Sequence, residues 1–157
     1  MTKIITLFSL FLLVAVFVQA QPAKDVFVEI GGPGLASFNY DMRFTNREDG
    51  IGGRVGVGGF KIDDVTAVFI PVGVNYLIGK NHRDYFEMGG GATFVSIKDR
   101  YGYNNDDVFR SSFGHLVFGY RLQPANGGFL FRASIVPIFG NGFFVPYYAG
   151  VAFGYKF

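Results

Sequence analysis

The 157-residue chain contains no cysteine and no tryptophan, and it has no long apolar run after residue 20. Without cysteine there is no disulfide framework, no thiol nucleophile and no cysteine-ligated metal site. Glycine, proline or a charged residue interrupts each later apolar run well before the roughly 18 residues that indicate a membrane-spanning helix. A membrane-spanning helix after residue 20 and a disulfide-stabilised secreted domain are both excluded.

The chain also lacks a strong charge of either sign. Its 14 Lys and Arg residues nearly balance 12 Asp and Glu residues, which leaves a net charge of +2. Nothing in this balance indicates a nucleic acid or an acidic partner. The length allows one domain.

Residues 1–20 have the pattern of a secretory signal peptide. Lys3 supplies the positive start, residues 4–18 form an apolar core, and Val18-Gln19-Ala20 fits a cleavage site. A retained membrane helix is the alternative, but the apolar run is shorter than the roughly 20 residues that a span needs. We therefore expect cleavage after Ala20 and a mature domain of residues 21–157.

The mature chain is dominated by alternation of apolar and polar residues, with turn residues between the alternating segments. This pattern predicts β-strands in an all-β sandwich or barrel. If residues 25–44 formed one bent strand, the count would fall to seven; otherwise it is eight. The predicted strands are 25–31, 35–44, 51–60, 65–78, 85–96, 111–122, 128–139 and 145–157.

The two faces of these strands differ in a way that favours a membrane barrel. Residues 35–44 place Phe38, Tyr40 and Met42 on one face and Asn39 and Asp41 on the other. Membrane barrels carry the apolar face outside and the polar face inside. A soluble sandwich, which buries its apolar faces against each other, is the alternative. We predict an eight-stranded antiparallel transmembrane β-barrel with up-and-down topology.

Charged residues on the polar faces would point into a narrow interior, because eight strands leave room only for side chains. We expect Arg54 and Arg132 to bridge Glu29, Asp41 and Glu87 there, since an unpaired buried charge is costly. Arg43, Arg121 and Lys156 lie nearer the strand ends, where water would solvate them.

Catalytic and metal-binding patterns are weak. His82 falls in a polar turn, and His115 lies on a predicted strand with Ser111 and Ser112 nearby but no evident acidic partner. No phosphate loop and no metal-ligand spacing is present. We expect no enzyme activity, no cofactor and no metal.

The last eleven residues, YYAGVAFGYKF, alternate strictly and end on phenylalanine. Together with the signal peptide and eight strands, they resemble small bacterial outer-membrane β-barrel proteins of the broad OmpA-like or porin-like kind. The resemblance implies insertion into the outer membrane by the barrel-assembly machinery, which would read Phe153, Tyr155 and Phe157. It also implies contact with outer-membrane lipid and lipopolysaccharide, and we expect a monomer.

The predicted connections suggest where such a barrel would meet its surroundings. Those at 45–50, 79–84 and 123–127 are short, whereas 97–110 is long and hydrophilic, as extracellular loops are. We expect a structural or surface-interaction role, with contacts through Tyr101, Tyr103, Asp106 and Asp107. The alternatives are a barrel that passes small solutes and a lipid A-modifying enzyme that depends on His115.

Overall fold

The computed structural model describes residues 22–63, 65–99 and 112–157. The described part consists of strands joined by turns and one short 3-10 turn, η1 (Gly32–Gly34). None of its helices is long and apolar enough to cross a membrane. The strands are β1 (Lys24–Gly31), β2 (Ala36–Arg43), β3 (Gly50–Ile62), β4 (Val65–Ile78), β5 (Asp84–Asp99), β6 (Phe113–Leu122), β7 (Gly128–Ile135), β8 (Ile138–Gly140), β9 (Phe143–Val145) and β10 (Ala149–Lys156).

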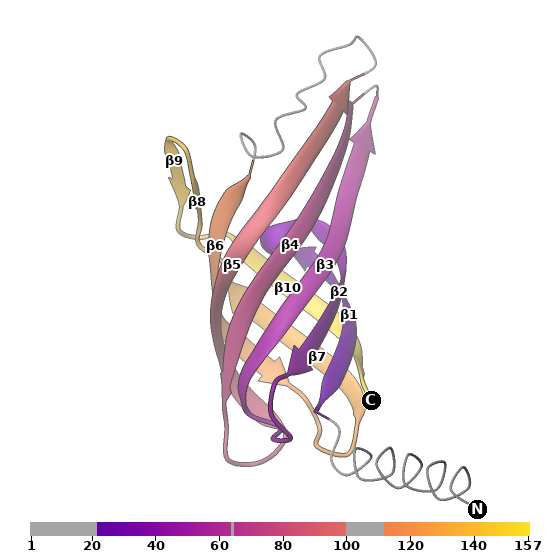
Figure 1. Ribbon diagram of the computed structural model, residues 1–157, viewed down its shortest axis with the longest axis vertical. Coiled ribbons are helices and arrows are strands. Elements are labelled where there is room, and N and C mark those ends of the chain that lie inside the picture. The colour runs from indigo at the N-terminus through magenta and orange to yellow at the C-terminus, as the bar shows by residue number, and fades with distance from the viewer. Residues whose placement is uncertain (1–21, 64, 100–111) are drawn as a thin grey trace, which may run out of the picture.

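The strands close into an antiparallel eight-stranded barrel, which confirms the predicted fold class (Figure 1). Each strand from β1 to β7 pairs with its neighbour in the chain, and β10 pairs with both β7 and β1. The β1–β10 seam runs from Asp25 opposite Lys156 to Gly31 opposite Gly150. Residues 25–44 therefore form two strands, separated by η1, and the count is eight.

The predicted seventh and eighth strands are each interrupted. β7 ends at Ile135, and β8 begins after Pro137, which has no N–H to donate to a neighbouring strand. The register against β6 is the same on both sides of the break, because Ile135 lies opposite Phe118 and Ile138 opposite His115. The predicted strand 128–139 is therefore one strand with a local break at proline.

A β-bulge separates β9 from β10. Two residues lie between Ile135 and Ile138 on one side of the pair, but three lie between Val145 and Ala149 on the other. The extra residue bends the pair. As a result β8 and β9 form a short hairpin that leans away from the barrel wall in Figure 1.

The barrel has two unlike ends. At the terminal end the start of β1 meets the end of the chain, and the Phe157 amide donates to the Lys24 carbonyl at 3.0 Å. At the opposite, distal end, β3, β4 and β5 rise beyond the other strands (Figure 1). β5 continues to Asp99, so the first residues of the predicted loop 97–110 belong to a strand.

Candidate functional site

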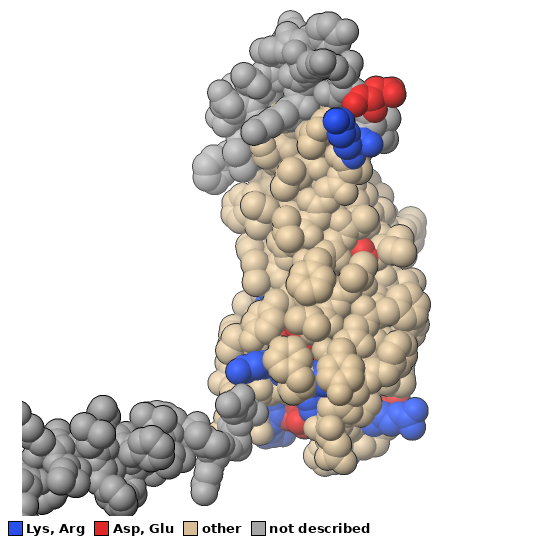
Figure 2. Space-filling model, turned by 90° about the vertical axis from the view of Figure 1, so that its right-hand side faces the viewer, with Lys and Arg blue, Asp and Glu red and all other residues tan. Residues whose placement is uncertain are grey.

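The barrel is apolar outside and polar inside. Along β10, Val151 and Phe153 are 40% and 50% exposed on the outer face, whereas Ala152 and Lys156 are buried on the inner face. Between the strand ends, no outward position of the described strands carries a charge. Figure 2 shows one side of this wall, with charged groups gathered mainly toward its two ends. This polarity is the reverse of a soluble barrel and is that of a barrel in lipid.

Four carboxylates and four guanidiniums are buried in the interior, and their formal charges cancel. A fifth buried cation, Lys156, pairs with the partly exposed Glu48 at the end of the barrel. Such a set can be stable in a narrow interior only when each group has a partner. The carboxylates belong to Asp25, Glu29, Asp41 and Glu87, and the guanidiniums to Arg43, Arg54, Arg121 and Arg132.

Arg54 on β3 pairs with Glu29 on β1 across the interior. Its guanidinium forms a salt bridge with the Glu29 carboxylate and also donates to Asn39 Oδ1 at 2.8 and 3.0 Å. Asn39 in turn donates to Ser37 Oγ at 3.0 Å. The side chains of β1, β2 and β3 are therefore joined by one polar cluster.

Arg132 on β7 pairs with Glu87 on β5. Nε and Nη2 of Arg132 donate to the two Glu87 oxygens at 2.9 and 2.6 Å, a two-point contact that fixes both side chains. The ring of Phe27 lies between the two arginines, with its centroid 5.2 Å from Arg54 Cζ and 4.4 Å from Arg132 Cζ. Phe27, Leu130 and Ala152 form a small apolar cluster inside the barrel.

Asp41 differs from the sequence-based expectation, because it pairs with neither Arg54 nor Arg132. It accepts from Arg43, which is two residues away on the same strand, and from Arg121 Nη2 at 3.2 Å. Arg121 also forms a salt bridge with Asp25. The sequence-based prediction did not include Asp25 among the interior charges. Asp25 lies four residues from Glu29 on the same strand and therefore points to the same face, which could have identified it.

The expectation that Arg43, Arg121 and Lys156 lie in water is wrong. Arg43 and Arg121 are fully buried, and Lys156 is 3% exposed. The reason is that the turn after β2 folds under the terminal end, where Glu48 forms a salt bridge with Lys156. Gln123 donates to the same Glu48 carboxylate at 3.3 Å.

Two further contacts organise this terminal end. Lys156 Nζ donates to the backbone carbonyls of Pro124 and Ala125 at 3.2 and 2.6 Å, which ties the β6–β7 turn to β10. In the turn after β2, hydrogen bonds from Arg47 hold the pKa of the Asp49 carboxyl below its usual range.

The distal end of the polar interior is covered by η1, whose three residues are buried. Thr93 Oγ1 on β5 donates to the Pro33 carbonyl at 3.1 Å and lies 3.3 Å from His115 Nδ1. His115 is 3% exposed and faces inward from β6. Within the described residues its side chain is thus enclosed in the barrel, turned away from the lipid-facing wall.

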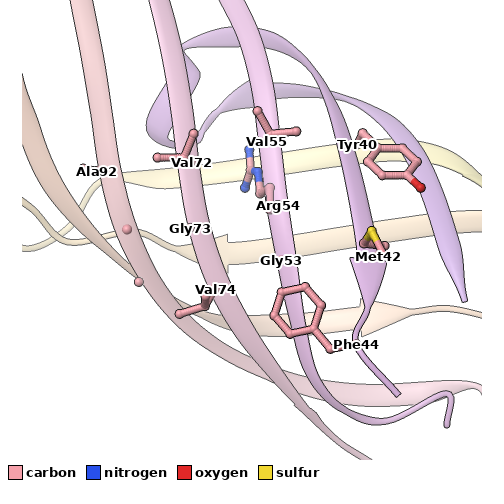
Figure 3. Close-up of a pocket in the computed structure, with 12 residues that line it drawn as sticks. Tyr40, Met42, Phe44, Gly53, Arg54, Val55, Val72, Gly73, Val74 and Ala92 are labelled. Atoms are coloured by element: carbon pink, nitrogen blue, oxygen red, sulfur yellow. The ribbon is translucent and has the colours of Figure 1, made fainter. Parts of the chain in front are cut away.

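A shallow groove of about 660 Å³ crosses the outer wall over β2 to β5 (Figure 3). Small residues at outward positions, Gly53, Gly90 and Ala92, form its floor, and Tyr40, Met42 and Phe44 flank it at β2. Its lining is apolar except for Arg54, whose guanidinium pairs with Glu29 in the interior. It lacks the converging polar groups of a catalytic pocket.

The structure places the remaining predicted site residues as follows. Phe153, Tyr155 and Phe157 all lie on the outer wall and are at least half exposed. The predicted contact residues Tyr101, Tyr103, Asp106 and Asp107 lie outside the described residues. Within the described part, no group of three or more His, Asp or Glu side chains is arranged to hold a metal ion.

Comparison with known proteins finds similarity of structure only. Neither a protein-family model nor a curated protein matches the sequence. The outer-membrane protein Ail of Yersinia pestis, in a phospholipid nanodisc, aligns over 87% of this chain and 100% of its own, with 14% identity and a TM-score of 0.55. The outer-membrane enzyme PagL aligns over 84% of this chain and 96% of its own, with 13% identity and a TM-score of 0.40. The chain shares the fold of Ail, a small outer-membrane β-barrel.

Proposed function

We propose that the protein is an integral barrel of the bacterial outer membrane with a sealed interior and a structural or surface-interaction role. The observation that carries this proposal is the combination of a charge-free outer wall with an interior filled by paired charges. Outer-membrane lipid and lipopolysaccharide would surround the wall. The barrel-assembly machinery would insert the chain, which would act as a monomer.

The filled interior argues against the alternative role of a solute channel. η1 covers the polar interior at the distal end, and Glu48 with Lys156 narrows the terminal end. Side chains of an eight-stranded barrel fill the available width. The test is conductance of the refolded protein in planar lipid bilayers. We expect no conductance steps beyond those seen with lipid and detergent alone. Reproducible conductance steps whose size increases with salt concentration would support a channel.

The distal end is the proposed contact surface, because β3, β4 and β5 extend beyond the other strands there and the hydrophilic segment 100–111 follows β5 in the sequence. Replacing residues 101–107 by a Gly-Ser linker should leave the heat-modifiable gel mobility of the folded barrel unchanged. It should abolish adhesion of displaying bacteria to epithelial cell layers. A variant that folds and adheres normally would contradict this assignment.

The second alternative is a lipid A-modifying enzyme. The enclosed position of His115, with Thr93 beside its ring, favours a packing role over attack on a lipid outside the wall. Mass spectra of lipid A from cells that express wild-type protein or His115→Ala should be the same. A modification present with the wild-type protein and lost in the variant would support the enzyme.

A further inference from the structure

The β8–β9 hairpin is an apolar projection of the described barrel. Its tip is Asn141-Gly142, and Phe139 pairs with Phe144 across the two strands. Phe144 is 64% exposed, and Tyr147, in the bulge that follows, is 90% exposed. Large apolar side chains grouped at a projection commonly mark a contact with another molecule or with lipid.

The two faces of the hairpin have different surroundings. On one face Phe143 lies against Phe113 of β6, with ring centroids 6.5 Å apart. On the other, Phe139 covers Gly114, and a Cβ at that glycine would lie only 2.3 Å from the Phe139 ring. Gly114 belongs to the outer wall, so Phe139 and its partner Phe144 extend the lipid-facing surface beyond β6.

Charge distinguishes this hairpin from the turns at the terminal end. Residues 133–155 contain no charged residue, whereas the turn after β2 contains Arg47, Glu48 and Asp49. The hairpin also leans sideways and ends lower in Figure 1 than the tips of β4 and β5. It therefore projects from the side of the barrel and ends short of the most distant point of the described strands.

We propose that the β8–β9 hairpin is a lateral anchor in the outer leaflet, with Phe139 and Phe144 against lipid acyl chains and Tyr147 at the headgroup level. Aromatic residues favour this interfacial depth because their rings are apolar and a tyrosine keeps a polar tip. The occupant is lipid and not a protein, since the hairpin face is continuous with the lipid-facing wall. This inference rests on the proposed membrane location.

Single cysteines carrying a polarity-sensitive fluorophore test the anchor, because the native chain has no cysteine that would also be labelled. The variants are Phe144→Cys, Val151→Cys on the wall and Lys61→Cys at the exposed distal end of β3, each in phospholipid vesicles. We expect blue-shifted emission at positions 144 and 151, with quenching by brominated acyl chains. Emission at position 61 should be water-like and unquenched.

The controls separate the two proposals. A water-like, unquenched label at position 144 with a buried label at 151 overturns the anchor but leaves the membrane location intact. Water-like labels at both positions overturn the membrane location itself. A blue shift at 144 that disappears on dilution with excess lipid would indicate contact with a second copy, which also overturns the anchor.

Discussion

The guanidinium carbon of Arg132 lies 4.4 Å from the centroid of the Phe27 ring, inside the barrel. The same guanidinium donates two hydrogen bonds to Glu87. Strands β7, β1 and β5 thus meet through one side chain at the centre of the interior. A cation over an aromatic face is worth up to about 2 kcal/mol when both groups are removed from water. The centre of the interior is consequently a packed core in which charged groups and apolar side chains are in contact.

Arg132→Met should destabilise the barrel by about 3–5 kcal/mol, because it leaves Glu87 buried without its two-point partner. Arg121 Nη1, at 3.7 Å from Glu87, is too distant to replace those hydrogen bonds. Urea unfolding in vesicles, followed by the heat-modifiable gel shift, measures the loss. Arg47→Met is the matched control, since the Arg47 side chain is 74% exposed and a solvent-exposed pair such as that with Asp49 adds little to stability. Equal losses in the two variants would contradict the role given to Arg132.

The double variant Arg132→Met with Glu87→Met should be more stable than the sum of the two single losses predicts. Removing both partners leaves no unpaired charge in the interior, so part of the penalty disappears. The same unfolding measurement on all four proteins gives the coupling free energy, which we expect to exceed about 1 kcal/mol. Strict additivity would show that the two residues act independently.

Gly154→Val should prevent folding. A Cβ at Gly154 would lie 2.1 Å from the Val26 carbonyl oxygen and 2.5 Å from Phe27 Cβ, so the β1–β10 seam could not close around Phe27. Ala149→Val, on the exposed outer face of the same strand, is the control and should fold normally. Refolding yield into detergent, measured by gel mobility, distinguishes them, and a normally folded Gly154→Val protein would refute the packing described for Phe27.

Phe157→Ala should slow assembly in cells more than it lowers stability. The Phe157 side chain is 60% exposed on the outer wall, so its removal creates no interior cavity. If the terminal aromatic residue is read during insertion, pulse-labelled cells should accumulate unassembled chain. The same variant refolded in detergent should unfold close to the wild-type urea midpoint. An unchanged assembly rate would contradict the proposed signal.

The outer wall was the part of the fold that could be predicted best from the sequence. Alternation with period two arises because one face of each strand meets lipid and the other meets the barrel interior. Phe38 and Tyr40 could therefore be assigned to one face and Asp41 to the other. The presence of Glu29 and Arg54 in the interior follows from the same parity. Their pairing agrees with the simple requirement that a charge in a narrow interior has a partner.

The remaining details depended on contacts that no local pattern contains. Arg121 and Arg43 lie near strand ends, and their burial follows from the fold of the turn that carries Glu48. Glu48 and Lys156 are far apart in the sequence, and no pattern around either residue predicts that the two form a salt bridge. Pro137 could be predicted to interrupt its strand. The one-residue offset that sets the β8–β9 hairpin at an angle could be recognised only from the register of both strand pairs.

Closure of β1 on β10 is the central claim, and a disulfide across the seam tests it most directly. Val28 lies opposite Phe153, and paired positions in antiparallel strands lie within disulfide range. Oxidation of the double variant Val28→Cys with Phe153→Cys should give an intramolecular disulfide in nearly all folded molecules. The offset pair Val26→Cys with Phe153→Cys should give little. A seam that forms no disulfide at 28 and 153, or forms it equally well from the offset pair, would contradict the closed barrel.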